Sequence, residues 1–248
     1  FYCNTECQRQ SWGEHRKVCV VHQEKKLEKE RSRRGDNKGA IAAACLDLGD
    51  LYMTRDRLPE AKERYMEALR IFGDVEGEES ERVAGMTMTL GILFGKQGEL
   101  DDALRMGKQA LRLFRRVHGD EHRNVADALV SVGGLLFKKG HFDGAMAKFE
   151  EARAMYVGLY GEEHETVAAV LGSMAKVLNA QGKGAEAPAM LQKSLDIMTR
   201  TIGTDCDPVV MSLLSLGSSY AQHGMLKEAL VRYEEGLGTV RRIHPEKT

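Results

Sequence analysis

The stretch Gly119–Gly140, GDEHRNVADALVSVGGLLFKKG, decides the fold because it recurs along the chain at a fixed spacing. Steps of 42 residues in either direction from Gly119 always land on another glycine, namely Gly35, Gly77, Gly161 and Gly203. The same steps from Val125 land on Val83, Val167 and Val209. Five copies follow one another without a slip, from Gly35 to His244. Self-similarity at one fixed spacing is typical of a solenoid of stacked repeats.

Each copy holds two amphipathic stretches, which predict two helices. In the copy that begins at Gly119, apolar residues at helical spacing predict helix A over about 124–139 and helix B over about 142–159. A small residue recurs on helix A, at Gly49, Gly91, Gly133, Ala175 and Gly217. An alanine recurs on helix B, at Ala61, Ala103, Ala145, Ala187 and Ala229. We expect these two small faces to let the helices of one copy approach closely.

The repeated residues resemble those of a known repeat family. The first copy carries Cys45, Leu48, Gly49 and Tyr52, then Ala61 and Tyr65, in the spacing of the tetratricopeptide (TPR) signature W-x2-L-G-x2-Y…A-x3-F. The extended unit and loops such as GDEH and GEEH resemble the long TPR units of kinesin light chains. This resemblance implies an all-α fold, a right-handed superhelical solenoid of five 42-residue helix pairs within residues 35–248. The repeats would span about 35–76, 77–118, 119–160, 161–202 and 203–244.

The first 20 residues, FYCNTECQRQSWGEHRKVCV, carry a different signal. Four potential metal ligands follow the spacing C-x3-C-x7-H-x3-C, namely Cys3, Cys7, His15 and Cys19. Thiolates and imidazole in this number suit a tetrahedral structural Zn²⁺ site. Together with Tyr2 and Trp12, the run resembles the second half of a MYND-type zinc finger, a class that binds proline-containing peptides.

The resemblance implies that two of these ligands serve one zinc ion and two serve another. The two C-x-x-C pairs that would complete both sites are absent from the chain. Because the chain begins at Phe1 rather than Met, we expect it to be a fragment or a processed piece, with those pairs upstream.

Residues 21–34 are almost wholly polar and are predicted to be a charged linker, either a solvated helix or a flexible spacer. The alternative, a nucleic-acid or nuclear-import patch, is weakened by Glu24, Glu28 and Glu30 between the basic residues. The whole chain has 36 Lys+Arg and 37 Asp+Glu, a balance that favours neither nucleic acid nor an anionic membrane. No apolar run approaches the ~20 residues of a membrane span. Cysteines beside a histidine are typical of metal ligation in a reducing, intracellular compartment, here cytoplasmic and/or nuclear.

Helix A is expected to line the inner, concave face of the solenoid and to form a peptide-binding groove. Its predicted lining residues are Leu46, Asp50, Met88, Ile92, Lys96, Val130, Lys138, Lys176, Asn179 and Leu214. We hypothesise that an extended peptide with an acidic or C-terminal carboxylate group binds the three lysines. The alternative is that these lysines only keep an exposed surface soluble.

No nucleotide-binding or nucleophile motif occurs, and the loop residues His122 and His164 recur at the repeat spacing, which favours helix capping over acid–base chemistry. We therefore interpret the chain as a non-enzymatic adaptor that binds extended or proline-containing peptides of other proteins. Two alternatives are a fragment of a MYND-containing SET-domain lysine methyltransferase and a motor-cargo adaptor. The sequence does not specify the oligomeric state.

Overall fold

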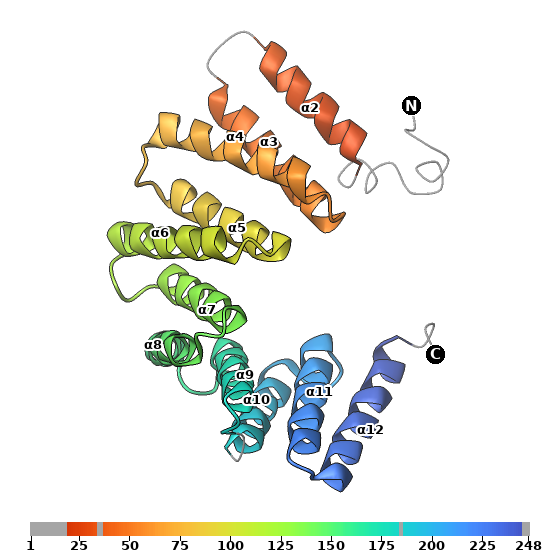
Figure 1. Ribbon diagram of the computed structural model, residues 1–248. Coiled ribbons are helices and arrows are strands. Elements are labelled where there is room, and N and C mark those ends of the chain that lie inside the picture. The colour runs from red at the N-terminus through yellow and green to blue at the C-terminus, as the bar shows by residue number, and fades with distance from the viewer. Residues whose placement is uncertain (1–18, 34–36, 184–185, 245–248) are drawn as a thin grey trace. The chain divides into compact units, whose positions relative to one another are not determined.

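The computed structural model describes residues 19–33, 37–183 and 186–244, and all regular structure in these ranges is α-helical (Figure 1). The helices are α2 (Val20–Ser32), α3 (Lys38–Thr54), α4 (Leu58–Glu76), α5 (Glu81–Gln97), α6 (Leu100–His118), α7 (Arg123–Lys138), α8 (Phe142–Tyr160), α9 (Glu165–Ala180), α10 (Ala187–Ile202), α11 (Asp207–Gln222) and α12 (Leu226–Ile243). None of these helices is long and apolar enough to cross a membrane.

The chain divides into two compact bodies, an N-terminal body of residues 1–119 and a C-terminal body of residues 120–248. In the N-terminal body, α3 packs on α4 and α5 packs on α6. In the C-terminal body the pairs are α7 with α8, α9 with α10, and α11 with α12. Within each body, helix B of one pair packs on helix A of the next. The predicted all-helical, TPR-like architecture is confirmed.

The turn inside each pair needs one residue in the left-handed region of backbone space. That residue is Gly98, Gly140, Gly182 or Gly224 in the later pairs, with φ between 71° and 80°. The first pair has Asp56 there instead, with φ of 58°. Glycine has no Cβ to clash in this region, and aspartate is among the few other residues that visit it routinely. The first pair therefore has the same left-handed residue in its turn as the later pairs, although that residue is aspartate rather than glycine.

The small residues of helix A create space for helix B, as the sequence predicts, but the occupant of that space differs from the expectation. A Cβ atom added to Gly133 would lie 2.8 Å from Cε1 of Phe149, and one added to Gly49 would lie 2.5 Å from Cε1 of Tyr65. The space is thus filled by a ring from helix B as well as by the predicted alanines, which are themselves buried. At Gly91 no ring is present, and an added Cβ would lie 3.3 Å from the backbone N of Gly107.

Candidate functional site

All ten residues predicted to line a groove are exposed or half-buried on the A helices. In the N-terminal body, Leu46 and Asp50 lie on α3, and Met88, Ile92 and Lys96 lie on α5. The other five lie in the C-terminal body, with Val130 and Lys138 on α7, Lys176 and Asn179 on α9, and Leu214 on α11. Each body therefore offers its own set of candidate contact residues.

The C-terminal body brings three of the ten predicted residues into one depression of about 810 Å³ between α9 and α11. These three are Lys176, Asn179 and Leu214, and Phe137 adds an aromatic wall. The Asn179 carboxamide oxygen accepts a hydrogen bond from the Ser219 hydroxyl at 3.2 Å, which holds the amide in place across the two helices. A depression with apolar walls, amide and hydroxyl groups and one ammonium group can bind a short peptide segment. Val130 and Lys138 do not line it.

The three predicted lysines form no ion pair within the described part of the chain. Lys96, Lys138 and Lys176 are exposed, and none forms an ion pair with another residue in the ranges that the structure describes. Two lysines on B helices of the C-terminal body do form ion pairs: Lys148 pairs with Glu151 at 2.7 Å, and Lys193 pairs with Glu162 at 3.1 Å. The A-helix lysines are therefore available to an external anion.

Asp50 has a structural partner that the sequence analysis missed. Its carboxylate accepts a hydrogen bond from the phenol of buried Tyr65 at 2.6 Å. Burial, together with this bond and the charge of Asp50, raises the pKa of Tyr65 well above its ordinary value. Tyr156 donates in the same way to Asp127 in the C-terminal body. The two pairs have different sequence spacings, so no repeat signal reveals them.

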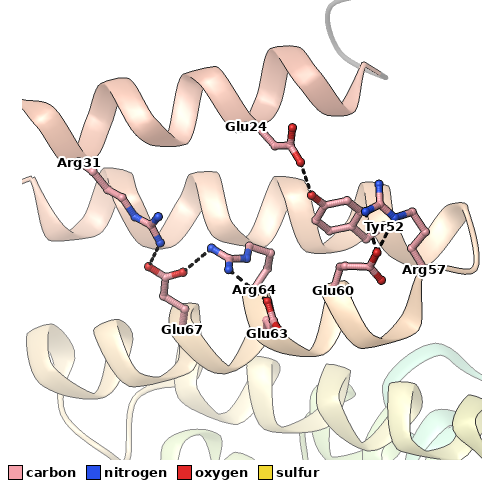
Figure 2. A network of polar contacts seen from close by, with 8 residues as sticks. All are labelled: Glu24, Arg31, Tyr52, Arg57, Glu60, Glu63, Arg64 and Glu67. Carbon is pink, nitrogen blue, oxygen red and sulfur yellow. Dashed lines mark hydrogen bonds and ion pairs between the residues drawn. The ribbon is translucent and has the colours of Figure 1, made fainter.

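The predicted charged linker forms helix α2, which packs on α3. Its Leu27 is only 3% exposed. Around Leu27, Glu24 accepts a hydrogen bond from the Tyr52 phenol at 2.5 Å, and Lys26 pairs with Asp47 at 2.8 Å. Arg31 reaches across to pair with Glu67 on α4 (Figure 2). Three basic residues of the alternative nucleic-acid patch, Lys26, Arg31 and Arg33, thus form ion pairs within the protein.

Below α2, the polar network continues along α3 and α4 (Figure 2). The guanidinium of Arg57 lies 4.5 Å from the centre of the Tyr52 ring, and burial together with the Glu24 hydrogen bond raises the pKa of Tyr52 to about 12. Glu67 is shared between Arg31 and Arg64, the latter at 2.8 Å. Burial works to raise the pKa of Glu67, but Arg31, the Cys45 thiol and Arg64 outweigh it, and the pKa is lowered.

The lowered pKa of Glu67 predicts a pH-dependent contribution to stability. Glu67→Gln is expected to lower the free energy of unfolding by about 1–2 kcal/mol at pH 7, because the charge-assisted bond to Arg31 is lost. A carboxylate whose folded pKa is depressed stabilises the protein above its unfolded pKa, here about 4.5, and loses that contribution as pH falls through the lower folded value.

Urea unfolding of both proteins between pH 7 and pH 3 should show that the difference in their free energies of unfolding shrinks below about pH 4.5. Exposed Glu63→Gln is the control and should change stability by less than about 0.5 kcal/mol; a Glu67→Gln deficit independent of pH would contradict the assignment.

Three of the four predicted zinc ligands, Cys3, Cys7 and His15, lie outside the described residues. The fourth, Cys19, is buried and occupies the N-cap position of α2. Among the residues that the structure describes, no group of three or more histidine, cysteine, aspartate or glutamate side chains is arranged to hold a metal ion.

The two loop histidines act as helix caps, as predicted. The Nδ1 atom of His122 accepts a hydrogen bond from the backbone N–H of Asn124 at 3.1 Å, at the start of α7. His164 accepts from Thr166 at 3.3 Å, at the start of α9. An N-cap acceptor satisfies one of the free N–H groups of the first turn. Both histidines therefore stabilise the first turn of an A helix.

A family model described as the MalT-like TPR region matches residues 34–204. None of the curated proteins compared with the sequence matches it. Among solved structures, BtubC (BKLC) from P. vanneervenii is 19% identical, with a TM-score of 0.77 over 95% of this chain and 93% of that one. A putative kinesin light chain of nearly identical TPR-like repeats from Podosopora anserina is 16% identical, with a TM-score of 0.69 over 86% of this chain and 100% of that one. A Rap protein complexed with Competence and Sporulation Factor is 16% identical, with a TM-score of 0.70 over 91% of this chain and 60% of that one.

Proposed function

Because the chain belongs to the family of MalT-like TPR regions, we propose that it is a non-enzymatic adaptor that binds peptides of partner proteins on its A-helix faces. We take the array as five units of 42 residues, each presenting one such face. The observation that carries the proposal is that Lys96, Lys138 and Lys176 are exposed on the A helices and form no ion pair with another described residue. The Rap protein, which is similar in fold, was solved in complex with Competence and Sporulation Factor, and this supports the proposal that this chain also binds a partner.

The ligand chemistry follows from the depression in the C-terminal body. Lys176 supplies a positive charge, Asn179 supplies an amide, and Leu214 with Phe137 supplies apolar surface. An extended peptide with a carboxylate next to an apolar side chain complements these groups. Each good contact of this kind is worth about 1–3 kcal/mol when the charge is partly desolvated.

Charge reversal on the A helices tests the proposal. Arrayed extended peptides that carry an acidic residue or a free C-terminus are expected to bind the chain, and Lys176→Glu should weaken that binding at least about tenfold through loss of attraction and added repulsion. Lys108→Glu, an exposed lysine on helix B of the second pair, is the matched control and should bind as the unchanged chain does. Fluorescence polarisation with the best peptides measures both. If the combined variant Lys96→Glu, Lys138→Glu and Lys176→Glu bound the peptides unchanged, the A-helix face would not be the binding site.

We also propose that residues 1–20 form part of a zinc-binding, MYND-type finger that binds proline-containing peptides, with Cys3, Cys7, His15 and Cys19 as ligands. Support comes from the ligand spacing and from Cys19, which the protein holds buried at the start of a docked helix. A finger and an array that both bind peptides would engage a two-site partner with increased avidity.

Metal analysis of the purified chain tests the finger. Cys19→Ser is expected to lower the bound zinc, because one of the two ligands that this chain supplies to that zinc ion is lost. Cys206→Ser, which alters a half-buried cysteine at the start of α11, should leave the zinc content unchanged. Equal zinc in the two variants would contradict the assignment of Cys19.

The motor-cargo alternative rests on the similarity of this chain to the putative kinesin light chain. At 16% identity, that similarity supports the fold alone. No family with catalytic activity supports the methyltransferase alternative. The adaptor is therefore the function that the described residues support best.

A further inference from the structure

Helix α2 occupies the place of a helix B that precedes the first pair. One repeat of 42 residues before α4 (Leu58–Glu76) corresponds to residues 16–34, and α2 (Val20–Ser32) lies inside that range. It packs on α3 in the way that α4 packs on α5 and α10 packs on α11. The first A helix is thus covered by a partial repeat, which caps the array within the same chain.

The other terminal B helix, α12, repeats the docking residues of α2. Three residues recur five repeats later: Glu24 as Glu234, Leu27 as Leu237, and Arg31 as Arg241. These are the residues through which α2 reaches its neighbours. The Glu24 carboxylate accepts a hydrogen bond from the Tyr52 phenol, and the Arg31 guanidinium pairs with Glu67 (Figure 2). Leu27 lies near Leu48 of α3.

On α12 the same three residues are without partners in the described part of the chain. Leu237 is 48% exposed, whereas Leu27 is 3% exposed and Leu195, at the same repeat position on α10, is 6% exposed. Leu195 belongs to a core cluster with Val209 and Leu213 of α11, and α12 has no following helix of this kind among the described residues. Glu234 and Arg241 are exposed and form neither an ion pair nor a hydrogen bond with another described residue.

The apolar part of this surface extends along α12. Leu230, two turns before Leu237, is 57% exposed, and Tyr233, one turn before it, is 38% exposed. At the same repeat positions α2 has Val20 and Gln23. Because larger apolar groups gain about 25 cal/mol per Å² when they are buried, α12 would gain more than α2 from covering the same face.

We propose that α12 of one copy docks on α3 and α4 of a second copy. There it takes the place of the second copy's own α2. Glu234 then accepts the hydrogen bond of the partner's Tyr52, Leu237 takes the position of Leu27, and Arg241 pairs with the partner's Glu67. This contact joins two different surfaces, the α12 face of one chain and the α3–α4 site of the next. Each complex therefore keeps one free surface of each kind, and further chains can add head to tail. Helix α2 competes with this contact, and its attachment to α3 by a short segment gives it a high effective concentration.

A charge reversal on α2 tests the competition in the full chain. Arg31→Glu places a negative charge against Glu67 and weakens α2 at its docking site, while Arg241 of a second copy keeps its partner. Light scattering coupled to gel filtration is expected to show concentration-dependent association at least about tenfold tighter than in the unchanged chain. The matched control is Arg33→Glu, because Arg33 directly follows α2 and pairs with Glu30 of α2 rather than with α3 or α4. Adding Leu237→Asp to Arg31→Glu should return the protein to the monomer; association that survives Leu237→Asp, or Arg31→Glu behaving as the control does at every concentration, would overturn the proposal.

A second experiment pairs two variants and does not depend on α2 remaining folded. Glu67→Arg repels both Arg31 and Arg241, and Arg241→Glu repels Glu67, so each variant alone should remain monomeric. An equimolar mixture restores opposite charges between Glu67→Arg of one chain and Arg241→Glu of the other, and should form a mixed complex. Far-UV circular dichroism checks that both variants keep their helices. A mixture that stays monomeric while both variants are folded would exclude docking of α12 at this site.

Discussion

Replacing Tyr65 with alanine is expected to lower the free energy of unfolding of the N-terminal body by about 3–5 kcal/mol. The side chain is 1% exposed, its ring fills the space beside Gly49, and its phenol donates to Asp50 at 2.6 Å. Alanine would leave a cavity between α3 and α4 and would remove the partner of Asp50. Because the chain has two bodies, urea unfolding should be followed by circular dichroism together with fluorescence, so that two transitions are resolved if they occur.

Tyr65→Phe separates the ring from the hydroxyl. Phenylalanine keeps the ring beside Gly49 and loses only the bond to exposed Asp50, so the expected cost is about 1 kcal/mol. Phe149 already stands at the same repeat position in the C-terminal body, which shows that the fold accepts a ring without a hydroxyl there. If alanine and phenylalanine lowered stability equally, the hydrogen bond rather than the packing would be the main contribution, contrary to this account.

Gly133→Ala is expected to destabilise the C-terminal body by about 1–3 kcal/mol. The added Cβ would lie 2.8 Å from Cε1 of Phe149, a ring that is buried and has little room to move. Gly134→Ala is a matched control on the same helix, since its Cβ would meet nothing within 4 Å. That variant should be neutral or more stable by up to about 1 kcal/mol, because alanine favours the helix over glycine. Thermal and urea unfolding measure both.

The fold itself contains the compensating change. In the fourth pair, Ala175 occupies the position of Gly133 and Leu191 occupies that of Phe149. Adding Phe149→Leu to Gly133→Ala reproduces this pair, and the double variant should be no less stable than Phe149→Leu alone. A double-mutant cycle therefore predicts a favourable coupling between the two changes. Strictly additive costs would show that the ring and the added methyl group do not compete for the same space.

Several features were predictable because they repeat. The glycines and alanines at fixed spacing identified the two helices of each pair and their close approach, and the loop histidines were correctly expected to cap helices. The ring beside Gly133 was not predicted, because the residue at that place changes from Tyr65 to Gly107, Phe149, Leu191 and Tyr233 along the chain. The TPR signature marks this position at Tyr65, but a side chain that varies in size from copy to copy does not reveal that it fills the space beside the small residue of helix A. The zinc ligands and the peptide contacts stay predictions.

The sequence by itself determined the repeating helix pairs, because every copy must bury the same face against a nearly identical neighbour and therefore keeps the same small and apolar residues. Only the tertiary structure decided the fate of residues 20–32 and of the two buried tyrosines. Helix α2 has one buried leucine, and its other contacts reach Asp47, Tyr52 and Glu67, which lie in later helices. Side chains that pair across helices leave no mark in the local composition, so a segment that is almost wholly polar became a docked helix through partners that only the folded chain brings close.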